Sequence, residues 1–295
     1  MARKISAITF AAMAALLAGN ALATEGGGGV YPNGNENYLV GAMPPPGTYW
    51  LAYAGYDHLT KLRDNNGDRI NVPFDVKVGA FAPRFVWVTD TKILGGQLAW
   101  HVIAPLLNVD VSVAGSSQRK TGLGDIVFGP GLGYHEGNLH YVFALDVNAP
   151  TGSYKKTDMA NTSRNYWNLE PLIAVSYVQP QGINADIKFH YDFNAENKDT
   201  KYKSGQEFHF DYALGYGFGN GWVAGVGGYV YQQVTADKLN GATVANAKGE
   251  AMGFGPSIKY DNGKGFFITA KWQKDFSVKN RAEGTALKVK FSIPF

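Results

Sequence analysis

The sequence predicts an all-β fold: a transmembrane, antiparallel, up-and-down β-barrel of about twelve strands that follows an irregular N-terminal leader. Three observations predict this fold. They are an export signal at the N-terminus, alternation of apolar and polar side chains over runs of ten residues or more, and connections that alternate between short and long. Only helices and closed barrels can cross a bilayer, because every backbone polar group must find its partner inside the protein.

The first 23 residues are typical of a secretory signal peptide. Arg3 and Lys4 supply the positive charge, Ile5 to Gly19 form an apolar stretch, and Ala21-Leu22-Ala23 is a small-x-small cleavage pattern. The apolar stretch is shorter than the roughly 20 residues that a permanent transmembrane helix needs. We therefore expect the mature chain to begin near Thr24; a buried N-terminal helix is the alternative.

Composition excludes several other classes of protein. The chain has no cysteine, which excludes a disulfide-stapled scaffold and thiolate chemistry. Removing Arg3 and Lys4 from the 27 basic residues leaves 25 against 24 acidic ones, a net charge of +1 that is too weak for nucleic-acid binding. The 37 glycines and the 14% of aromatic residues suit the turns and aromatic girdles of a membrane barrel.

Alternation of side chains is the strongest sign of strands. From Ile183 to Phe193, apolar residues take one face of the chain and polar residues take the other. The pattern recurs at 139–148, 208–218 and 286–295. A soluble sandwich also alternates, yet its strands are usually about 5 to 6 residues long. Runs of ten or more have the length that a tilted strand needs to cross hydrocarbon.

Residues 48–295 are expected to form the barrel. Twelve alternating runs occur, at 48–58, 73–89, 94–114, 122–135, 138–150, 164–178, 182–194, 206–218, 221–236, 249–261, 264–277 and 284–295. An even number fits a bacterial barrel with both ends in the periplasm. We expect a bulge or bend near Pro83 and Arg84, and either one strand with a bulge near Pro105 or two short strands. The terminal Phe295 resembles the signal that the barrel assembly machinery reads.

Tight turns alternate with longer polar connections. Glu136–Asn138, Gly219–Gly221 and Asn262–Lys264 carry the Gly and Asn that positive φ angles favour. The longer connections are expected at 61–72, 116–121, 152–163, 196–205, 236–249 and 279–283. Periplasmic turns and external loops alternate in this way in outer-membrane barrels. We therefore expect a monomer in the bacterial outer membrane, in contact with membrane lipid and lipopolysaccharide.

Residues 24–47 fall outside the strand pattern. This leader begins with Gly26–Gly29, ends with Pro44-Pro45-Pro46-Gly47 and shows no useful periodicity. Two interpretations stay open. The leader is a flexible periplasmic segment, or it is a plug inserted into the barrel, where Tyr31, Tyr38 and Met43 would narrow the lumen.

A series of short motifs runs through the whole mature chain. They are Gly26–Gly29 with Tyr31-Pro32-Asn33-Gly34, Pro44–Gly47, Gly122–Ile126, Pro150-Thr151-Gly152, Asn194–Asn197, Tyr202–Gly205, Gly225–Tyr229, Gly255-Pro256 and Asn280–Gly284. In this order they resemble the outer-membrane transporters of the phenol-degradation MetA-pathway family, which includes SphA-like proteins. The resemblance implies a barrel with a role in the uptake of hydrophobic or aromatic compounds.

The polar faces of neighbouring strands carry the best candidate site. Its residues are Asp186, Lys188, His190, Asp192, His209 and Asp211, with Glu170 beside them. If these strands face a lumen, the side chains project into it and could pair across the sheet. They would then form a polar constriction that selects or orients a permeant. The alternative is that networked charges fill the interior of a small barrel.

The sequence offers little for catalysis or for metal binding. It contains neither Gly-x-Ser-x-Gly nor Gly-His-x-Ser, and no serine lies near His190 or His209 on the same face. The six histidines lack metal-ligand spacing, and Asp64–Asp68 departs from the order of an EF-hand loop. We therefore predict no catalytic residue, no metal and no cofactor.

Together these observations predict a passive outer-membrane channel or transporter for small hydrophobic or aromatic solutes. Twelve strands leave a narrow lumen once side chains fill it, which disfavours a wide aqueous pore. Three alternatives stay open: a structural or stress-induced barrel without a specific permeant, a barrel hydrolase that acts through His190, Asp192, His209 and Asp211, and a soluble periplasmic β-protein.

Overall fold

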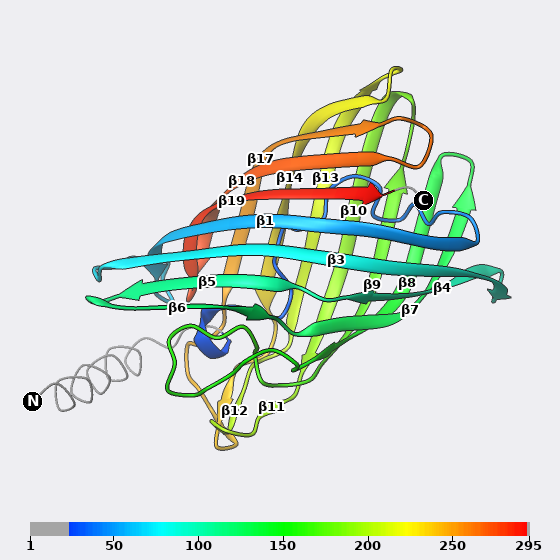
Figure 1. Ribbon diagram of the computed structural model, residues 1–295. Coiled ribbons are helices and arrows are strands. Elements are labelled where there is room, and N and C mark those ends of the chain that lie inside the picture. Colours follow the sequence, from blue (N-terminus) through cyan, green and yellow to red (C-terminus); the bar gives the residue numbers. More distant parts are fainter. Residues whose placement is uncertain (1–23, 294–295) are drawn as a thin grey trace, which may run out of the picture.

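A closed antiparallel β-barrel is the main feature of the computed structural model, which describes residues 24–293 (Figure 1). Strand β1 pairs with both β3 and β19, and this double pairing closes the wall. The all-β fold and the count of twelve wall strands are confirmed. The expected signal peptide and Phe295 lie outside the described residues. Among residues 24–293, no helix has the length and apolar character to span a membrane.

Ten wall strands are single elements and two are composite. The single strands are β1 (Gly47–Arg63), β3 (Phe74–Ile93), β8 (Leu139–Ala149), β9 (Asn168–Tyr177), β10 (Gln181–Asn194), β13 (Glu207–Phe218), β14 (Trp222–Gln233), β17 (Glu250–Asp261), β18 (Phe267–Lys279) and β19 (Ala282–Ile293). The composite strands are β4 (Gly96–Ile103) with β5 (Leu106–Val113), and β6 (Ser116–Leu123) with β7 (Ile126–Glu136). Strands β4 and β5 both pair with the one long strand β3.

The break between β4 and β5 lies at Pro105, where the sequence allowed one strand or two. Proline has no N–H to donate to a ladder. Ala104 N donates instead to the carbonyl of Pro83 at 3.1 Å. Of the bulge or bend expected at Pro83 and Arg84, the bulge is wrong, because β3 keeps one continuous register with β1 through both residues. The irregularity falls on the neighbouring strand, at the proline.

Residues Ser116–Thr121, which the sequence analysis expected to be a loop, belong to strand β6. Ala114 and Gly115 form the turn before it, with φ angles of +51° and +82° that suit a two-residue hairpin. The run lacks apolar residues on either face until Leu123, so its alternation is hidden in the sequence. The connection after β8 covers the free edge of β6, where Met159 N and Ala160 N donate to Gln118 at 2.6 and 3.0 Å.

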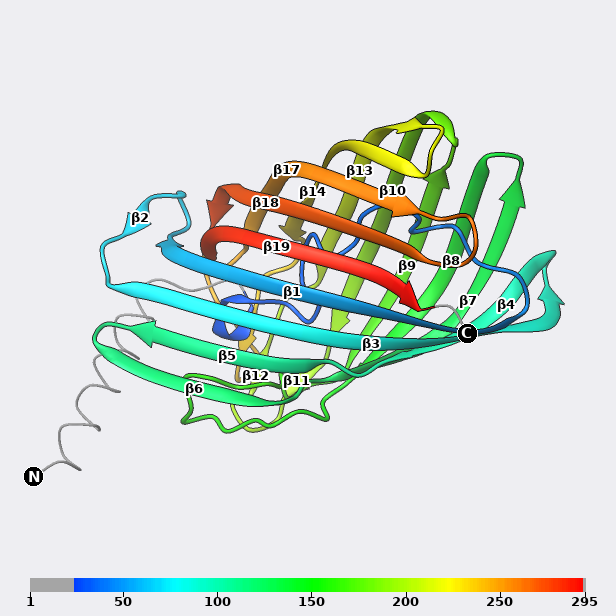
Figure 2. The ribbon, with the colours of Figure 1, turned by 45° about the horizontal axis from the view of Figure 1, so that its top comes forward.

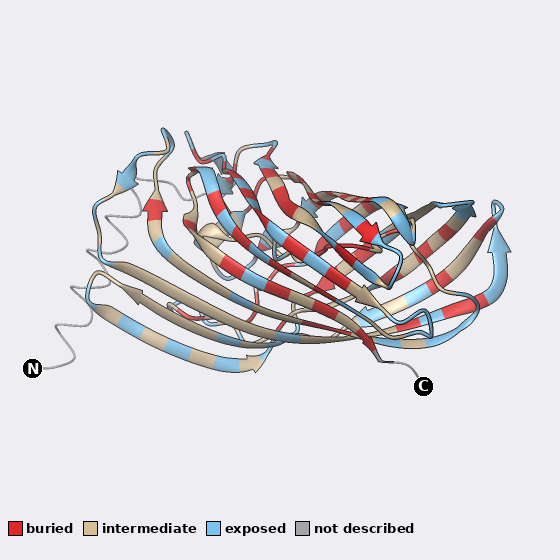
Figure 3. Ribbon diagram, turned by 90° about the horizontal axis from the view of Figure 1, so that it is seen from above, coloured by how far each residue is buried: buried red, intermediate tan, exposed pale blue. Residues whose placement is uncertain are grey.

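The wall is apolar outside and charged inside. Buried and exposed positions alternate along the strands (Figure 3). Trp87, Ile183 and Leu214 are among the large side chains that are half exposed on the outer face, whereas Lys271 and His190 are about 1% exposed inside. Soluble proteins arrange these residue types the other way round. The outer face therefore fits hydrocarbon, and the protein is a transmembrane barrel of the outer-membrane type. The soluble periplasmic alternative is wrong.

The two ends of the barrel differ in their connections. Short turns at 94–95, 137–138, 178–180, 219–221 and 262–266 lie at the end where β1 begins, and the longer connections lie at the other end (Figures 1 and 2). That end also has two-residue turns at 114–115 and 280–281, so the longer connection expected at 279–283 is wrong. Short turns face the periplasm in such barrels. At the long-loop end, β2 (Arg69–Ile70) pairs with β1, while β11 (Glu196–Asn197), β12 (Tyr202–Lys203), β15 (Lys238–Leu239) and β16 (Ala242–Thr243) form a small second sheet.

The leader, residues 24–46, threads the lumen from the long-loop end to the short-turn end (Figure 2). It contains the short 3-10 helix η1 (Glu25–Gly27). At the long-loop end, Glu25 N donates to Ser204 Oγ at 3.1 Å. Near the short-turn end, Gly41 N donates to Ser176 Oγ at 2.8 Å. The leader therefore lies inside the barrel and contacts its wall along its length.

Candidate functional site in the barrel lumen

Side chains of the barrel wall hold the leader by its backbone. Asp211 on β13 accepts hydrogen bonds from Gly34 N and Glu36 N, each at 2.8 Å, and from the Tyr31 hydroxyl at 2.7 Å. Asp186 on β10 accepts one from Val40 N at 3.1 Å. A buried N–H without a strand partner must be satisfied by other groups. Alternation along the strands supplies these groups, because every second side chain points into the lumen and many of those on β10 and β13 are polar.

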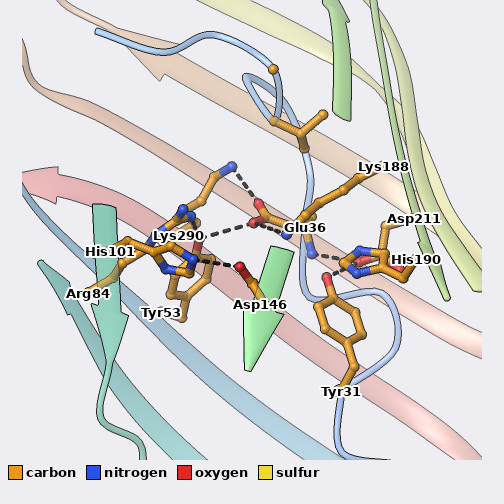
Figure 4. Close-up of polar contacts among 12 residues, drawn as sticks. Tyr31, Glu36, Tyr53, Arg84, His101, Asp146, Lys188, His190, Asp211 and Lys290 are labelled. Carbon is orange, nitrogen blue, oxygen red and sulfur yellow. Dashed lines mark hydrogen bonds and ion pairs between the residues drawn. The ribbon is translucent and has the colours of Figure 1, made fainter. Parts of the chain in front are cut away.

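Glu36 is the centre of the most highly charged contact in the lumen. Its carboxylate accepts a hydrogen bond from Lys290 Nζ at 2.7 Å and one from the Tyr53 hydroxyl at 3.0 Å, and Lys188 Nζ lies 3.5 Å away. Figure 4 shows these side chains gathered around it, with Arg84 beside Tyr53. Glu36 is 4% exposed. The arrangement is a buried ion cluster, in which loss of one partner is costly.

The charge of Glu36 follows from its neighbours. Burial alone would raise the pKa of this carboxyl, because a low-dielectric surrounding disfavours the anion. The ammonium groups of Lys290 and Lys188 and the guanidinium of Arg84 outweigh burial and hold the pKa well below its ordinary value. Glu36 is therefore an anion at neutral pH, although it is buried.

The seven residues predicted as a lumen site all point inward, but they divide into two groups. Asp186 and Asp211 accept hydrogen bonds from the leader, and Lys188 forms an ion pair with it. The other four form two His–carboxylate pairs: His190 Nδ1 with Glu170, and His209 Nε2 with Asp192 at 2.8 Å. As expected for cross-strand neighbours, His190 lies directly opposite His209 in the register of β10 and β13. Binding of a permeant by these residues stays a prediction.

Glu170, His190 and His209 are close enough to be examined as a metal site, since one ligand atom from each lies within 4.8 Å of the others. The imidazoles of His190 and His209 are stacked, with centroids 4.5 Å apart and planes inclined by 17°. A histidine binds metal along a lone pair in its ring plane, and nearly parallel planes direct these lone pairs side by side. Tyr31 also stacks on both rings, at 4.3 and 4.9 Å. This packing does not favour a shared metal ion.

Several lumen residues escaped the sequence analysis, above all Glu36, Tyr53 and Arg84. The leader has no periodicity, so its path cannot be deduced from strand rules. One signal was available, however. Glu25 and Glu36 are the acidic residues of a leader that has no Lys or Arg, while the last strand repeats lysine at 288 and 290 on its inward face. Opposite charges of this kind favour docking of the leader inside the barrel.

A cavity of about 350 Å³ lies between the leader and one side of the barrel. Seven apolar side chains on that side, which we call the apolar wall, line it: Leu59, Val78, Ala80, Ala82, Ile103, Leu107 and Val127 from β1, β3, β4, β5 and β7. The same strands also contribute Tyr53, Asp57, Arg84 and His101 to the lining. We call the opposite side, strands β8 to β19, the polar wall. Charged side chains of the polar wall and of the leader, such as Lys188 and Glu36, line the rest of the cavity. A cavity of a few hundred Å³ that combines apolar surface with placed polar groups is typical of sites for small organic ligands.

A second cavity of about 110 Å³ lies along the leader from the first, lined by Leu39, Met43, Leu51 and other side chains. Six residues line both cavities: Glu36, Tyr53, Arg84, His101, Asp146 and Lys188. Within this group, His101 Nε2 and Asp146 are hydrogen-bonded at 2.8 Å. The six residues form a polar constriction between two cavities that are lined largely by apolar groups.

Comparison with known proteins gives one family and several related folds. The family model described as "Putative MetA-pathway of phenol degradation" matches residues 60–291, as the motifs in the sequence indicated. No curated protein sequence matches the chain.

Two solved structures illustrate the likeness of fold. An outer membrane channel from Pseudomonas putida F1 is 17% identical, with a TM-score of 0.77 over 90% of this chain and 100% of that one. The transport unit of the autotransporter AIDA-I from Escherichia coli is 8% identical, with a TM-score of 0.51 over 87% of this chain and 93% of that one. At such identities the similarity concerns the barrel architecture.

Proposed function

The chain belongs to the family of the MetA pathway of phenol degradation, and on that premise we propose that it is a passive outer-membrane channel for small hydrophobic or aromatic compounds. The observation that carries this proposal is the cavity of about 350 Å³ against the apolar wall. Water forms few hydrogen bonds with the apolar wall. An apolar ring that moves from water onto this wall is stabilised by about 25 cal/mol per Å² of buried apolar surface.

The leader is the plug of this channel in our proposal. It occupies the lumen beside the polar wall, and its contacts with Asp211, Asp186 and Lys290 keep it there. A permeant then enters from the long-loop end, occupies the larger cavity and meets the polar constriction around Glu36. Passage needs only a small displacement of the leader, and no energy source.

We also propose that the lumen carries no catalysis. Three inward histidines each pair with a carboxylate: His190 with Glu170, His209 with Asp192 and His101 with Asp146. Tyr31 stacks on the rings of His190 and His209. A hydrolase needs a nucleophile within hydrogen-bond reach of its base and a donor for the oxyanion. The polar wall supports the alternative role of these residues, which is to fill and order the barrel interior.

Uptake into intact cells tests the proposal. Small aromatic solutes cross phospholipid vesicles unaided, whereas lipopolysaccharide retards them, so the assay needs an intact outer membrane. The full chain is produced in a host that lacks general porins and related channels, and uptake of radiolabelled toluene and arabinose is followed. We expect faster entry of toluene and unchanged entry of arabinose. Equal rates of toluene entry with and without the protein would refute a transport function, and would favour a purely structural barrel.

A further inference from the structure

Four donor side chains from four different strands converge on one carboxylate. Lys290 of β19, Lys188 of β10 and Tyr53 of β1 contact Glu36, and the guanidinium of Arg84 on β3 lies next to the Tyr53 hydroxyl, with Nη1 at 3.0 Å. Three of the four groups are cations. The nearby acid Asp146 is already paired with His101. The pocket is therefore built to hold an anion, and the leader supplies one.

Arg84 retains a donor that the leader does not use. Its Nη1 donates to Tyr53, but its Nε is buried and has no hydrogen-bond partner. A guanidinium binds carboxylates best through two parallel hydrogen bonds, and a buried donor without a partner costs free energy. Arg84 lines both cavities. The unused Nε thus offers a binding position for a second carboxylate that arrives through the lumen, once the side chains that cover this atom shift.

The space next to this donor is apolar. Ala82 and Ile103 lie on the same wall as Arg84 and line the larger cavity together with Val78 and Ala80. A ligand in this position would bury a ring against the apolar wall while its anionic group faced the cations. Few ligand classes match both features at once. A sugar would leave the apolar wall uncovered, and a simple hydrocarbon would leave Arg84 Nε unpaired.

We propose that the Glu36 pocket is a carboxylate-binding site, that its resting occupant is the leader's own side chain, and that its ligand is a small aromatic carboxylate. This inference rests on the proposed function and names a solute class for it. The arriving anion binds Arg84 first and then replaces Glu36 at Lys188 and Lys290. No net charge is left unpaired in the wall, because one carboxylate exchanges for another.

Exchange at this pocket also loosens the plug. Glu36 joins the middle of the leader to three wall strands through its carboxylate. By contrast, the contacts at Asp186 and Ser176, and two of the three at Asp211, are made by backbone N–H groups. A displaced Glu36 side chain must leave the constriction, and the leader moves with it. The solute therefore opens the passage that it uses, and a neutral ring of the same size does so less well.

Binding to the purified full chain in nanodiscs tests the site. Benzoate and benzyl alcohol carry the same ring and differ in charge, so calorimetric titration of both isolates the contribution of the carboxylate. We expect benzoate to bind at least several-fold more tightly. Glu36→Gln should tighten benzoate binding further because the resident anion is gone, and Arg84→Met should abolish the preference. Glu25→Gln is the matched control, since Glu25 is the other leader acid and lies outside the pocket.

Equal affinity for benzoate and benzyl alcohol would overturn the inference, as would an effect of Glu36→Gln no larger than that of Glu25→Gln. If the Glu36 variant does not fold, as judged by heat-modifiable migration in gels, a second measurement decides. The chain has no cysteine, so Asn35→Cys gives one thiol in the leader, at the edge of the larger cavity. Benzoate, but not benzyl alcohol, should speed its labelling by a small thiol reagent; equal rates contradict the exchange.

The outcomes for this site and for transport are separable. If toluene enters cells faster with the protein but benzoate does not bind, the carboxylate site is refuted and the channel remains. If benzoate binds and displaces the leader but no solute enters cells faster, the transport function is refuted and the binding site remains.

Discussion

The polar wall and the apolar wall are built by the same rule and yet bind different things. In both, every second side chain points into the lumen. The polar wall faces the leader, whose N–H groups require acceptors such as Asp211 and Asp186. The apolar wall faces a cavity, and its small side chains such as Ala80 and Ala82 leave room. An inward direction alone therefore does not decide whether a side chain is polar. Side chains that face the N–H groups of the leader are polar, and side chains that face the cavity are small and apolar.

The largest expected effect is on docking of the leader, and it follows from loss of a polar-wall cation in the ion cluster around Glu36. Lys290→Met removes the closest cation from Glu36 and the donor to the Tyr38 carbonyl, so docking of the leader should weaken by about 3 kcal/mol. Hydrogen exchange of the backbone N–H groups in residues 31–41 measures this weakening as a lower free energy for detachment of the leader from the wall. Lys264→Met, in an exposed turn, is the control. Unchanged exchange in the Lys290 variant would mean that the cluster does not hold the leader.

The next effect concerns Asp211, which accepts three leader donors. Asp211→Asn keeps the shape but turns one oxygen into an NH₂ group. With the remaining oxygen on Tyr31 and Glu36, Gly34 N loses its acceptor and faces the new NH₂ group; the opposite orientation loses the other two hydrogen bonds. We expect docking to weaken by about 2 kcal/mol, with faster exchange at Gly34 and Glu36. Asp90→Asn, at an exposed position, should leave exchange of the leader unchanged. Equal exchange in both variants would place the leader's anchor elsewhere.

A smaller effect concerns pH. The pKa of Glu36 is lowered by its cations when the leader is docked, so its contribution to docking is complete above the ordinary value of 4.5 and is lost as pH falls below that value. Mobility of a spin label at Asn35→Cys should therefore stay constant from pH 7 to pH 5 and rise below. With Glu36→Gln the label should not respond in this range. A rise already between pH 7 and pH 5 would contradict the charge assignment.

The smallest effect concerns Glu25 at the long-loop end of the leader. Here docking is favoured by lower pH, opposite to the pH dependence expected from Glu36. Burial raises the pKa of Glu25, even though hydrogen bonds from Thr200, Asn197 and Tyr154 oppose the rise. A raised carboxyl pKa favours the docked state at low pH, and this contribution is lost as pH rises through the raised value. A label at Gly28→Cys should become slightly less mobile as pH falls from 7 to 5. Glu25→Gln should remove that change; if it persists, another group causes it.

Strand positions could be predicted from the sequence because alternate residues of a membrane strand face lipid and lumen, and the two environments favour different residue types. Ile183–Phe193 shows the pattern fully, since lipid lies on one side and charged lumen on the other. The rule failed at β6, where neither face of Ser116–Thr121 carries apolar residues. It also predicted a bulge at Pro83 that is absent, since β3 keeps one register with β1 through this residue.

The candidate site was only half predictable for a related reason. His190, Asp192 and His209 could be placed in the lumen from their strands, and their neighbours on β10 and β13 followed from the register. The partners of Asp211 and Lys188 could not, because both contact the leader, whose path no periodicity specifies. The type of a residue and the face of the strand on which it lies are local properties. Which residue it contacts in the lumen depends on the path of the leader through the closed barrel.

The most direct measurement compares toluene uptake by two variants that differ in which face of the wall they change. Ala80→Trp fills the cavity from the apolar wall, whereas Ala54→Trp adds the same ring to the lipid-facing side of β1, where aromatic residues are common. Both keep the leader's contacts. The account predicts that Ala80→Trp abolishes the increase in toluene uptake and that Ala54→Trp preserves it. Full uptake through the Ala80 variant would contradict the claim that the permeant travels between the leader and the apolar wall.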